Sequence, residues 1–309
     1  MDTIVKIREK ARLKQKTIVF PEYDDRRVAE AAKILEREDI VKPLLLTPDK
    51  IDAKEKEKYA QEFYELRKIK GIDLDTARKT LEDPLYYAAM MTRSGKVDGF
   101  VAGAAHTTSD VARASLRCLG VDGRLAVACS CFVMVVPDCP YGAHGTFVYA
   151  DCGFIPEPNS RQLACVAILA SELASKILDL SPKVALLSYS TKGSAKGRSV
   201  DKIIGALSII KGMAPEVIVD GELQIDAAIV PEVAQIKYPN SLLGGQANVL
   251  IFPDLDAGNI SYKLTQRLAK ARAVGPLILG LNKPCSDLSR GCSVDDVVDC
   301  AAITAIRVL

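Results

Sequence analysis

A short segment near the end of the chain holds the side chains best suited to chemistry. Ser289 and Arg290 stand just before Gly291, and Asp296 follows at the start of an amphipathic run. A serine donates a hydrogen bond, a guanidinium binds anionic oxygens and a carboxylate can accept a proton, which together suits acyl or phosphoryl transfer on an anionic substrate. A structural interpretation is also open, because Ser293-x-x-Asp296 fits a capping box. The two roles can coexist.

Two further polar clusters each follow a predicted strand. The segment 103–110 combines small residues, hydroxyls and His106, with Arg113 one turn later, so its amide N–H groups can hold an anion. Its alternative interpretation is a plain helix start capped by Ser109 or Thr108. The segment 188–197 carries lysines, glycines and hydroxyls suited to phosphate, although the Walker A spacing is absent and a flexible basic loop is the alternative.

A weaker cluster, 253–263, also follows a predicted strand, and there Asp256 or Asn259 could simply cap the next helix. In parallel α/β sheets, ligands bind beyond the carboxyl ends of the strands, which is where all these clusters fall.

The elements that must position these clusters alternate between short apolar runs and helical patterns, which predicts an α/β fold with a largely parallel sheet. The predicted strands are Thr17–Phe20, Pro43–Leu46, Val97–Ala102, Leu125–Val136, Thr146–Ala150, Val184–Tyr189, Val217–Asp220, Asn248–Phe252 and Pro276–Leu281. The predicted helices are Asp25–Glu38, Tyr59–Ile69, Leu74–Glu82, Ser109–Leu119, Ser160–Leu178, Val200–Lys211, Asn259–Ala271 and Val294–Val308. The turn-rich segment 137–142 predicts a hairpin connection.

The overall composition limits the classes of protein to which the chain can belong. A chain of 309 residues, 49% hydrophobic and 26% charged, suggests a globular protein of about two domains. A net charge of +2 gives no field that favours nucleic acid or membrane. We expect no signal peptide and no membrane span. The nine irregularly spaced cysteines predict buried thiols in a reducing cytoplasm, and two histidines are too few for a typical His-rich metal site.

Taken in order, the clusters resemble the phosphate acetyltransferase (phosphotransacetylase) family, within the phosphate acetyl/butyryl-transferases. The resemblance covers nearly the whole chain from about Thr17. The segments that carry it are Val97-Asp98-Gly99, Gly103-Ala104-Ala105-His106, Ala150-Asp151-Cys152-Gly153, Ser188-Tyr189-Ser190-Thr191-Lys192-Gly193-Ser194-Ala195-Lys196, Asp220-Gly221-Glu222-Leu223-Gln224, Gly258-Asn259-Ile260 and Asp287-Leu288-Ser289-Arg290-Gly291-Cys292.

The resemblance implies an acyltransferase that interconverts acetyl-CoA plus phosphate with acetyl phosphate plus CoA in the cytoplasm. It also implies two three-layer α/β/α domains of the isocitrate/isopropylmalate dehydrogenase-like type, with a cleft between them, in a homodimer. Domain 1 would comprise 1–124 and 279–309, including the catalytic loop and last helix. Domain 2, 125–278, would be inserted and carry the acyl-phosphate loop and the dimer interface. Neither a metal nor a cofactor beyond the CoA substrates is implied.

The resemblance also assigns roles to residues. Asp296 is similar to the base that takes the CoA thiol proton, Arg290 to the group that stabilises charge on the carbonyl oxygen, and Ser289 to a hydrogen-bonding partner. The substrate-binding residues expected in the same way are Arg67, Ser109, His106, Arg113, Ser190, Thr191, Lys192, Gly193, Ser194, Asn259 and Tyr262. Direct transfer with both substrates bound, without an acyl-enzyme, is expected.

Proton transfer sets a condition on this assignment. A thiol has a pKa near ~8.5 and a carboxylate near ~3.9, so the transfer is uphill by about 4.6 units, roughly 6 kcal/mol. Asp296 therefore cannot act through basicity alone. We hypothesise that arginine charge lowers the pKa of the thiol, which makes Arg290 and Asp296 one functional pair.

Two other functions stay open at this level. A phosphate butyryltransferase differs only in the acyl pocket, and one or two methylenes shift binding by only about 1–3 kcal/mol. A non-catalytic acetyl-CoA sensor is the other, because related domains regulate some malic enzymes.

Overall fold

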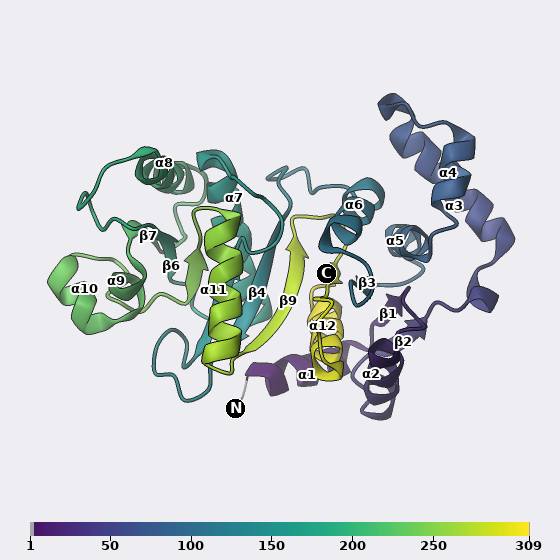
Figure 1. The fold of residues 1–309 in the computed structure, drawn as a ribbon, viewed down its shortest axis with the longest axis horizontal. Coiled ribbons are helices and arrows are strands. Elements are labelled where there is room, and N and C mark those ends of the chain that lie inside the picture. Colours follow the sequence, from purple (N-terminus) through teal and green to yellow (C-terminus); the bar gives the residue numbers. More distant parts are fainter. Residues whose placement is uncertain (1–2, 309) are drawn as a thin grey trace. The chain divides into compact units, whose positions relative to one another are not determined.

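The computed structural model describes residues 3–308 and divides the chain into two units. Unit 1 comprises Met1–Gly123 and Leu281–Leu309, and unit 2 comprises Arg124–Gly280. These boundaries lie beside the predicted ones at 124/125 and 278/279. Both units are of the predicted α/β class with mostly parallel strands (Figure 1).

Unit 1 is built on four parallel strands in the order β2-β1-β3-β10. These strands are β1 (Thr17–Phe20), β2 (Lys42–Leu45), β3 (Gly99–Ala102) and β10 (Cys285–Asp287). Its helices are α1 (Thr3–Lys14), α2 (Arg26–Arg37), α3 (Ala53–Arg67), α4 (Leu74–Thr80), α5 (Pro84–Ser94), α6 (Thr108–Cys118) and α12 (Val294–Ile306). Short 3₁₀ turns cover Pro48–Lys50 and Lys68–Lys70. Helices α1, α2 and α12 pack on one side of the strands, and α5 and α6 on the other (Figure 1).

Unit 2 carries six strands in the order β9-β4-β5-β8-β6-β7, where only β4 runs antiparallel to its neighbours. They are β4 (Cys129–Val135), β5 (Thr146–Ala150), β6 (Val184–Leu187), β7 (Val219–Leu223), β8 (Val249–Ile251) and β9 (Arg272–Leu279). Its helices are α7 (Ser160–Glu172, continued by a π-turn at Leu173–Ile177), α8 (Arg198–Met213), α9 (Ile225–Ile229), α10 (Pro231–Lys237) and α11 (Leu255–Leu268). The antiparallel β4–β5 pair confirms the predicted hairpin connection.

The last helix shows why the chain returns to unit 1 at its end. The core positions Val297, Val298, Ala301 and Ala305 of α12 are fully buried, but the amphipathic pattern predicted for this segment is wrong, because every residue from Val297 to Ile306 is buried. The helix packs against α1, α2 and β3. At about 0.8 kcal/mol per buried methylene, this burial stabilises unit 1.

The capping residues considered for two helices were wrong. Thr107, not Ser109 or Thr108, caps α6, and its hydroxyl accepts from the Asp110 amide. Asp254, not Asp256 or Asn259, caps α11 at the Ala257 amide, 2.9 Å away. In both segments several neighbouring residues can cap, so composition alone does not select one.

Strand β10 and helices α1, α5, α9 and α10 were not predicted. β10 has only three residues, Cys285-Ser286-Asp287, and no apolar alternation to mark it. It forms because it pairs in parallel with β3. Long-range pairing, not local propensity, makes this segment a strand.

All nine cysteines lie in the described part of the chain and are thiols, with every one except Cys139 buried. The predicted buried thiols are thereby confirmed for the other eight. No helix within residues 3–308 is both long and apolar enough to cross a membrane.

Candidate active site

In unit 1, the carboxyl ends of the parallel strands β1, β3 and β10 lie side by side, and each is followed by a polar turn. Glu22 follows β1, the turn Gly103–His106 follows β3, and the segment Leu288–Ser293 follows β10. The parallel pairing of Asp287 with Ala102 brings the last two turns together. This is the edge at which parallel α/β folds bind ligands.

The turn after β3 is organised by a carboxylate that the sequence did not reveal. Glu22 is 3% exposed. Its Oε2 accepts the amides of Gly103 (3.0 Å) and Ala104 (2.8 Å), and its Oε1 accepts those of Ala105 (2.9 Å) and His106 (2.8 Å). We predicted that these amides could hold an anion. The anion they bind is the protein's own carboxylate.

His106 is fixed by the same group. Its Nδ1 lies 2.7 Å from Glu22 Oε1, and its Nε2 lies 3.9 Å from Asp83 Oδ1. Burial opposes ionisation of Glu22, but hydrogen bonds from His106 and the turn amides bring the pKa of Glu22 below its usual value. The hydrogen bond to Glu22 raises the pKa of His106. The hydrogen bond between the Glu22 carboxylate and the His106 imidazole therefore orients the predicted substrate-binding ring.

The segment after β10 is a tight turn that leads into α12. The Ser289 hydroxyl accepts the Gly291 amide at 3.2 Å, and the Ser289 carbonyl accepts the Cys292 amide at 2.8 Å. The predicted capping box is confirmed: Asp296 Oδ2 accepts the Ser293 amide at 2.8 Å, and Ser293 Oγ accepts the Asp296 amide at 3.2 Å. One carboxylate oxygen of Asp296 thus fixes the side chain.

The guanidinium of Arg290 has a different environment. Arg290 is exposed and makes no side-chain hydrogen bond or ion pair with any described residue. An arginine in this state has all five of its N–H donors available. The structure therefore places Ser289 and Arg290 on the turn and Asp296 in the first turn of α12, with the cation uncommitted and the carboxylate oriented.

The other predicted arginines of unit 1 lie on helices beside this edge. Arg67 ends α3, which packs against α6, and its Nε is buried without a hydrogen-bond partner among the described residues. Arg113 on α6 is half exposed and pairs with Asp110 at 2.9 Å. Ser109 is exposed in the first turn of α6. Buried donor atoms without partners are rare, so Arg67 is a candidate for an anionic ligand.

In unit 2, the loop after β6 closes around a second buried carboxylate. Glu222 is 2% exposed, and its Oε1 accepts the Ser190 hydroxyl at 3.0 Å and the Gly193 amide at 2.7 Å. Ser194 Oγ accepts the Thr191 amide at 3.0 Å. Gly193 adopts φ +84°, a conformation that favours glycine. The polar groups of this predicted substrate loop largely hold the loop in shape.

Lys192 is engaged within the protein. Its Nζ lies 2.7 Å from Asp220 Oδ1, donates to the Gly221 carbonyl and sits 5.1 Å from the centre of the Tyr238 ring. Asp220 is buried. In this state the lysine neutralises the buried Asp220 carboxylate. A substrate anion would have to share the lysine ammonium with Asp220.

The remaining two predicted residues lie on α11. Asn259 Nδ2 donates to the Cys152 carbonyl at 3.1 Å, so this side chain ties α11 to the turn after β5. Tyr262 is 8% exposed, and its ring stacks on Phe132 with a centroid distance of 4.0 Å. The hydrophobic core of unit 2 surrounds it. Its substrate contact stays a prediction, while its packing role is evident.

Asp151 is another buried carboxylate that orders a turn. Asp151, 2% exposed, accepts Ser130 Oγ at 2.5 Å and the amides of Gly153 and Ile155 at 3.0 and 2.9 Å. Burial raises the pKa of Asp151. Each of Glu22, Asp151 and Glu222 thus orders a turn at the carboxyl edge of its unit. A sequence signal existed, because each acid stands at or just after a predicted strand end.

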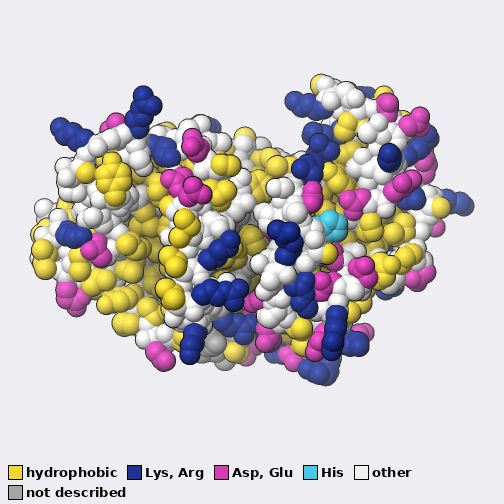
Figure 2. Space-filling view, viewed as in Figure 1, with side chains coloured by type: hydrophobic (Ala, Val, Ile, Leu, Met, Phe, Trp, Pro, Cys, Tyr) yellow, Lys and Arg dark blue, Asp and Glu magenta, His cyan; other side chains and the backbone are white. Residues whose placement is uncertain are grey.

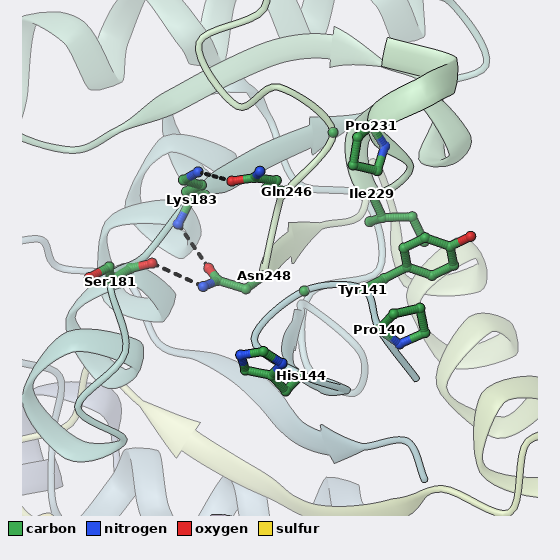
Figure 3. Close-up of a pocket in the computed structure, with 11 residues that line it drawn as sticks. Pro140, Tyr141, His144, Ser181, Lys183, Ile229, Pro231, Gln246 and Asn248 are labelled. Carbon is green, nitrogen blue, oxygen red and sulfur yellow. Dashed lines mark hydrogen bonds between the residues drawn. The ribbon is translucent and has the colours of Figure 1, made fainter. Parts of the chain in front are cut away.

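A pocket of about 410 Å³ lies elsewhere in unit 2, before the first residues of β5, β6 and β8 (Figure 3). His144, Tyr141 and Lys183 line it, but none of the predicted site residues does. Its polar groups bond one another: the Lys183 amide donates to Asn248 Oδ1 at 2.8 Å, and Lys183 Nζ donates to Gln246 Oε1 at 2.5 Å. This opposite edge of the strands is not the candidate active site. Across residues 3–308, no group of three or more His, Cys, Asp and Glu side chains is arranged to hold a metal ion.

Comparison with known proteins shows the family of the chain. The family model described as phosphate acetyl/butaryl transferase matches residues 2–305. The phosphate acetyltransferase of Acetivibrio thermocellus is 47% identical over 99% of this chain and 98% of its own length, and that of Bacillus subtilis is 40% identical over 100% and 99%. The crystal structure of a phosphotransacetylase from Streptococcus pyogenes superposes with a TM-score of 0.90 at 39% identity, covering 99% of this chain and 98% of that one. The chain belongs to the phosphate acetyl/butaryl transferase family and is an acyltransferase.

Proposed function

We propose that this protein transfers an acetyl group reversibly between CoA and inorganic phosphate, forming acetyl phosphate and CoA from acetyl-CoA and phosphate. The observation that carries the proposal is the segment after β10 in a chain of this family, where the Arg290 side chain is uncommitted and the capping box at the start of α12 orients Asp296. The named relatives are phosphate acetyltransferases, which favours acetyl over butyryl as the acyl group.

In the direction of CoA acetylation, Asp296 accepts the thiol proton and the thiolate attacks the carbonyl carbon of acetyl phosphate. The C–S bond forms, the bond between the carbonyl carbon and the phosphate oxygen breaks, and phosphate leaves with its electron pair. Arg290 stabilises the negative charge that develops on the carbonyl oxygen. Ser289 positions the reacting groups by hydrogen bonding. The step balances without a redox or group-carrying cofactor.

A single displacement in a ternary complex fits the cysteine environment. Cys292 is the thiol nearest the turn, and it is 7% exposed. Burial raises the pKa of Cys292 to about 11, so almost none of it is thiolate at neutral pH. The turn therefore lacks an activated nucleophile of its own, and CoA supplies the sulfur.

The substrate anions require several cations. We infer that Arg67 and Arg113 bind phosphate groups of CoA at the carboxyl edge of unit 1, with Ser109 and His106 nearby. The loop Ser190–Ser194 and Asn259 are proposed to bind the acyl phosphate at the corresponding edge of unit 2. Any contribution of the Lys192 ammonium to binding of the acyl phosphate belongs to this same proposal.

We also infer a homodimer in the cytoplasm. The outer face of α11 exposes Ile260, Leu264 and Leu268 at 57%, 52% and 79%, and Figure 2 shows hydrophobic side chains gathered along this helix. Exposed apolar side chains at positions i, i+4 and i+8 form a stripe on one helix face, which favours burial against a protein partner. A second copy of the chain buries this stripe against its own across a two-fold axis. Leu264→Glu should yield monomers by light scattering after size exclusion, whereas Leu13→Glu, at an 87% exposed position on α1, should not. A wild type that is already monomeric would refute the dimer.

The activity is tested by following thioester absorbance with acetyl-CoA, with and without phosphate. We expect loss of the thioester only when phosphate is present, and a loss of rate of at least about 10²-fold in Arg290→Gln. Equal rates with acetyl- and butyryl-phosphate in the reverse direction would refute the acetyl preference. Binding of acetyl-CoA without turnover would refute the enzyme and favour a sensor.

A further inference from the structure

One arginine near the candidate site has no donor left for a substrate. Arg27, in the first turn of α2, makes five side-chain hydrogen bonds, which equals the number of N–H donors on a guanidinium. Its Nε and Nη2 bind Asp25 Oδ1 and Oδ2 at 3.1 and 2.7 Å. Its Nη2 also donates to the Ala104 carbonyl at 2.8 Å, and its Nη1 donates to the carbonyls of Arg290 and Cys292 at 2.7 and 3.1 Å.

These bonds join the three polar turns at the carboxyl edge of unit 1. Asp25 caps α2 just after β1, Ala104 lies in the turn after β3, and Arg290 and Cys292 lie in the turn after β10. The partners are 77, 263 and 265 residues away from Arg27 along the chain for its three carbonyl bonds. One side chain thus fixes the spacing of segments that chain connectivity leaves independent.

The two bonds from Nη1 bracket Gly291. Both the Arg290 and the Cys292 carbonyls point at the same nitrogen, which sets the direction in which the chain reverses between Ser289 and Ser293. Hydrogen bonds from an ionised donor are stronger than those between neutral groups. The backbone of Arg290 is therefore fixed by Arg27, while the side chain of Arg290 stays uncommitted.

Asp25 fixes the orientation of the Arg27 guanidinium. It binds Arg27 through both carboxylate oxygens and also accepts the Arg27 amide at 2.8 Å as the N-cap of α2. The hydrogen bonds to Arg27 lower the pKa of Asp25. Because a bidentate pair fixes the plane of the guanidinium, the two Nη groups face the carbonyls at a defined angle.

We propose that Arg27 is a positioning residue for the catalytic turn: its saturated guanidinium holds the backbone of Arg290 and Cys292 so that the Arg290 side chain meets the acyl carbonyl. The proposal rests on the proposed function, because that function gives a role to Arg290, the group that Arg27 positions. It differs from a substrate-binding role, which would need at least one donor that Arg27 does not have.

The test compares Arg27→Lys and Asp25→Asn with the wild type. Lysine keeps the charge but has three donors and no fork, so it cannot reproduce five bonds. Asparagine still caps α2 but loses one charged oxygen.

We expect kcat to fall by about 10²-fold in Arg27→Lys, as for a misplacement of about 1 Å, with the KM for CoA changed by less than threefold. Asp25→Asn should give a smaller loss of kcat in the same direction. The matched control is Arg78→Lys, which removes a fork to Glu57 on the surface and should leave kcat unchanged.

Amide hydrogen exchange gives a readout independent of activity. The Cys292 amide bonds the Ser289 carbonyl in the wild type, so Arg27→Lys should speed its exchange by at least about tenfold, while amides in α8 stay unchanged. If the wild type turns over no acetyl-CoA, the proposed function fails, yet exchange still decides whether Arg27 orders the turn. Unchanged exchange in Arg27→Lys, or a raised KM with an unchanged kcat, would overturn the proposal.

Discussion

Asp287 ends β10 directly before the turn that holds Ser289 and Arg290, and its ionisation offers a quantitative prediction. It is 1% exposed, and neither of its carboxylate oxygens has a hydrogen-bond partner within residues 3–308. The glycine beside it is required: a Cβ on Gly103 would lie 2.2 Å from Asp287 Oδ1. Burial raises the pKa of Asp287 from 3.8 to about 7, and the nearby Glu22 carboxylate adds to the rise.

The sign of the resulting pH effect follows from proton linkage. Between about pH 4 and pH 7, the folded protein keeps a proton on Asp287 that the unfolded chain has lost. Stability therefore falls as the pH rises through this window, by about 1.4 kcal/mol per pH unit, and levels off above about pH 8. Between pH 5.5 and 8.5 this carboxyl alone lowers the free energy of unfolding by about 2 kcal/mol, because roughly 1.5 pH units of the window from pH 4 to 7 lie above pH 5.5.

Asp287→Asn replaces the carboxyl with a neutral amide of the same shape. The free energy of unfolding of the variant minus that of the wild type should rise by about 2 kcal/mol between pH 5.5 and 8.5. Urea unfolding followed by circular dichroism at several pH values measures this difference, and taking the difference cancels the titration of other groups. Asp24→Asn, at an exposed position in the same unit, is the control and should give a difference independent of pH. A flat difference for Asp287→Asn, or one that falls with pH, would refute the buried, protonated carboxyl.

The remaining predictions concern other charged groups. Arg290→Gln and Asp296→Asn should each lower kcat at least about 10²-fold, and the double variant should be little worse than either, because the pair acts as a unit; additive losses would argue against it. Glu22→Gln should destabilise the fold by about 3 kcal/mol, since at least one buried amide loses its acceptor. In the same variant the pKa of His106, which NMR should place above 6.5 in the wild type, should fall, and an unchanged value would contradict the contact. The ion pair at Lys192 predicts that Lys192→Met destabilises unit 2 by about 3 kcal/mol, as measured by urea unfolding; unchanged stability would show that its buried carboxylate partner does not need it.

The features predicted correctly from the sequence depend on residues that lie close together along the chain. The strands Thr17–Phe20 and Thr146–Ala150 were predicted with the bounds observed. The capping box at Ser293 follows from spacing alone. The placement of Asp296 in the first turn of α12 was predictable for the same reason.

The parts that were not predicted depend on contacts between distant residues. Glu22 meets the Gly103 amide across 81 positions of the chain, and no periodicity marks such a pair. Arg27 meets the Cys292 carbonyl across 265. β10 becomes a strand only by pairing with β3. The sequence therefore indicated candidate side chains for the site and acids that follow strand ends, but not which distant turns those acids and Arg27 hold in place.

The central claim, acyl transfer between a thiol and phosphate, is tested most directly by identifying the product of acetyl-CoA turnover. Purified protein is incubated with acetyl-CoA and phosphate, and CoA and acetyl phosphate are quantified in the same sample by mass spectrometry. The mechanism predicts one acetyl phosphate for every CoA released, with both products lost together in Asp296→Asn. Release of CoA with free acetate as the product, or bound acetyl-CoA that is never consumed, would contradict it.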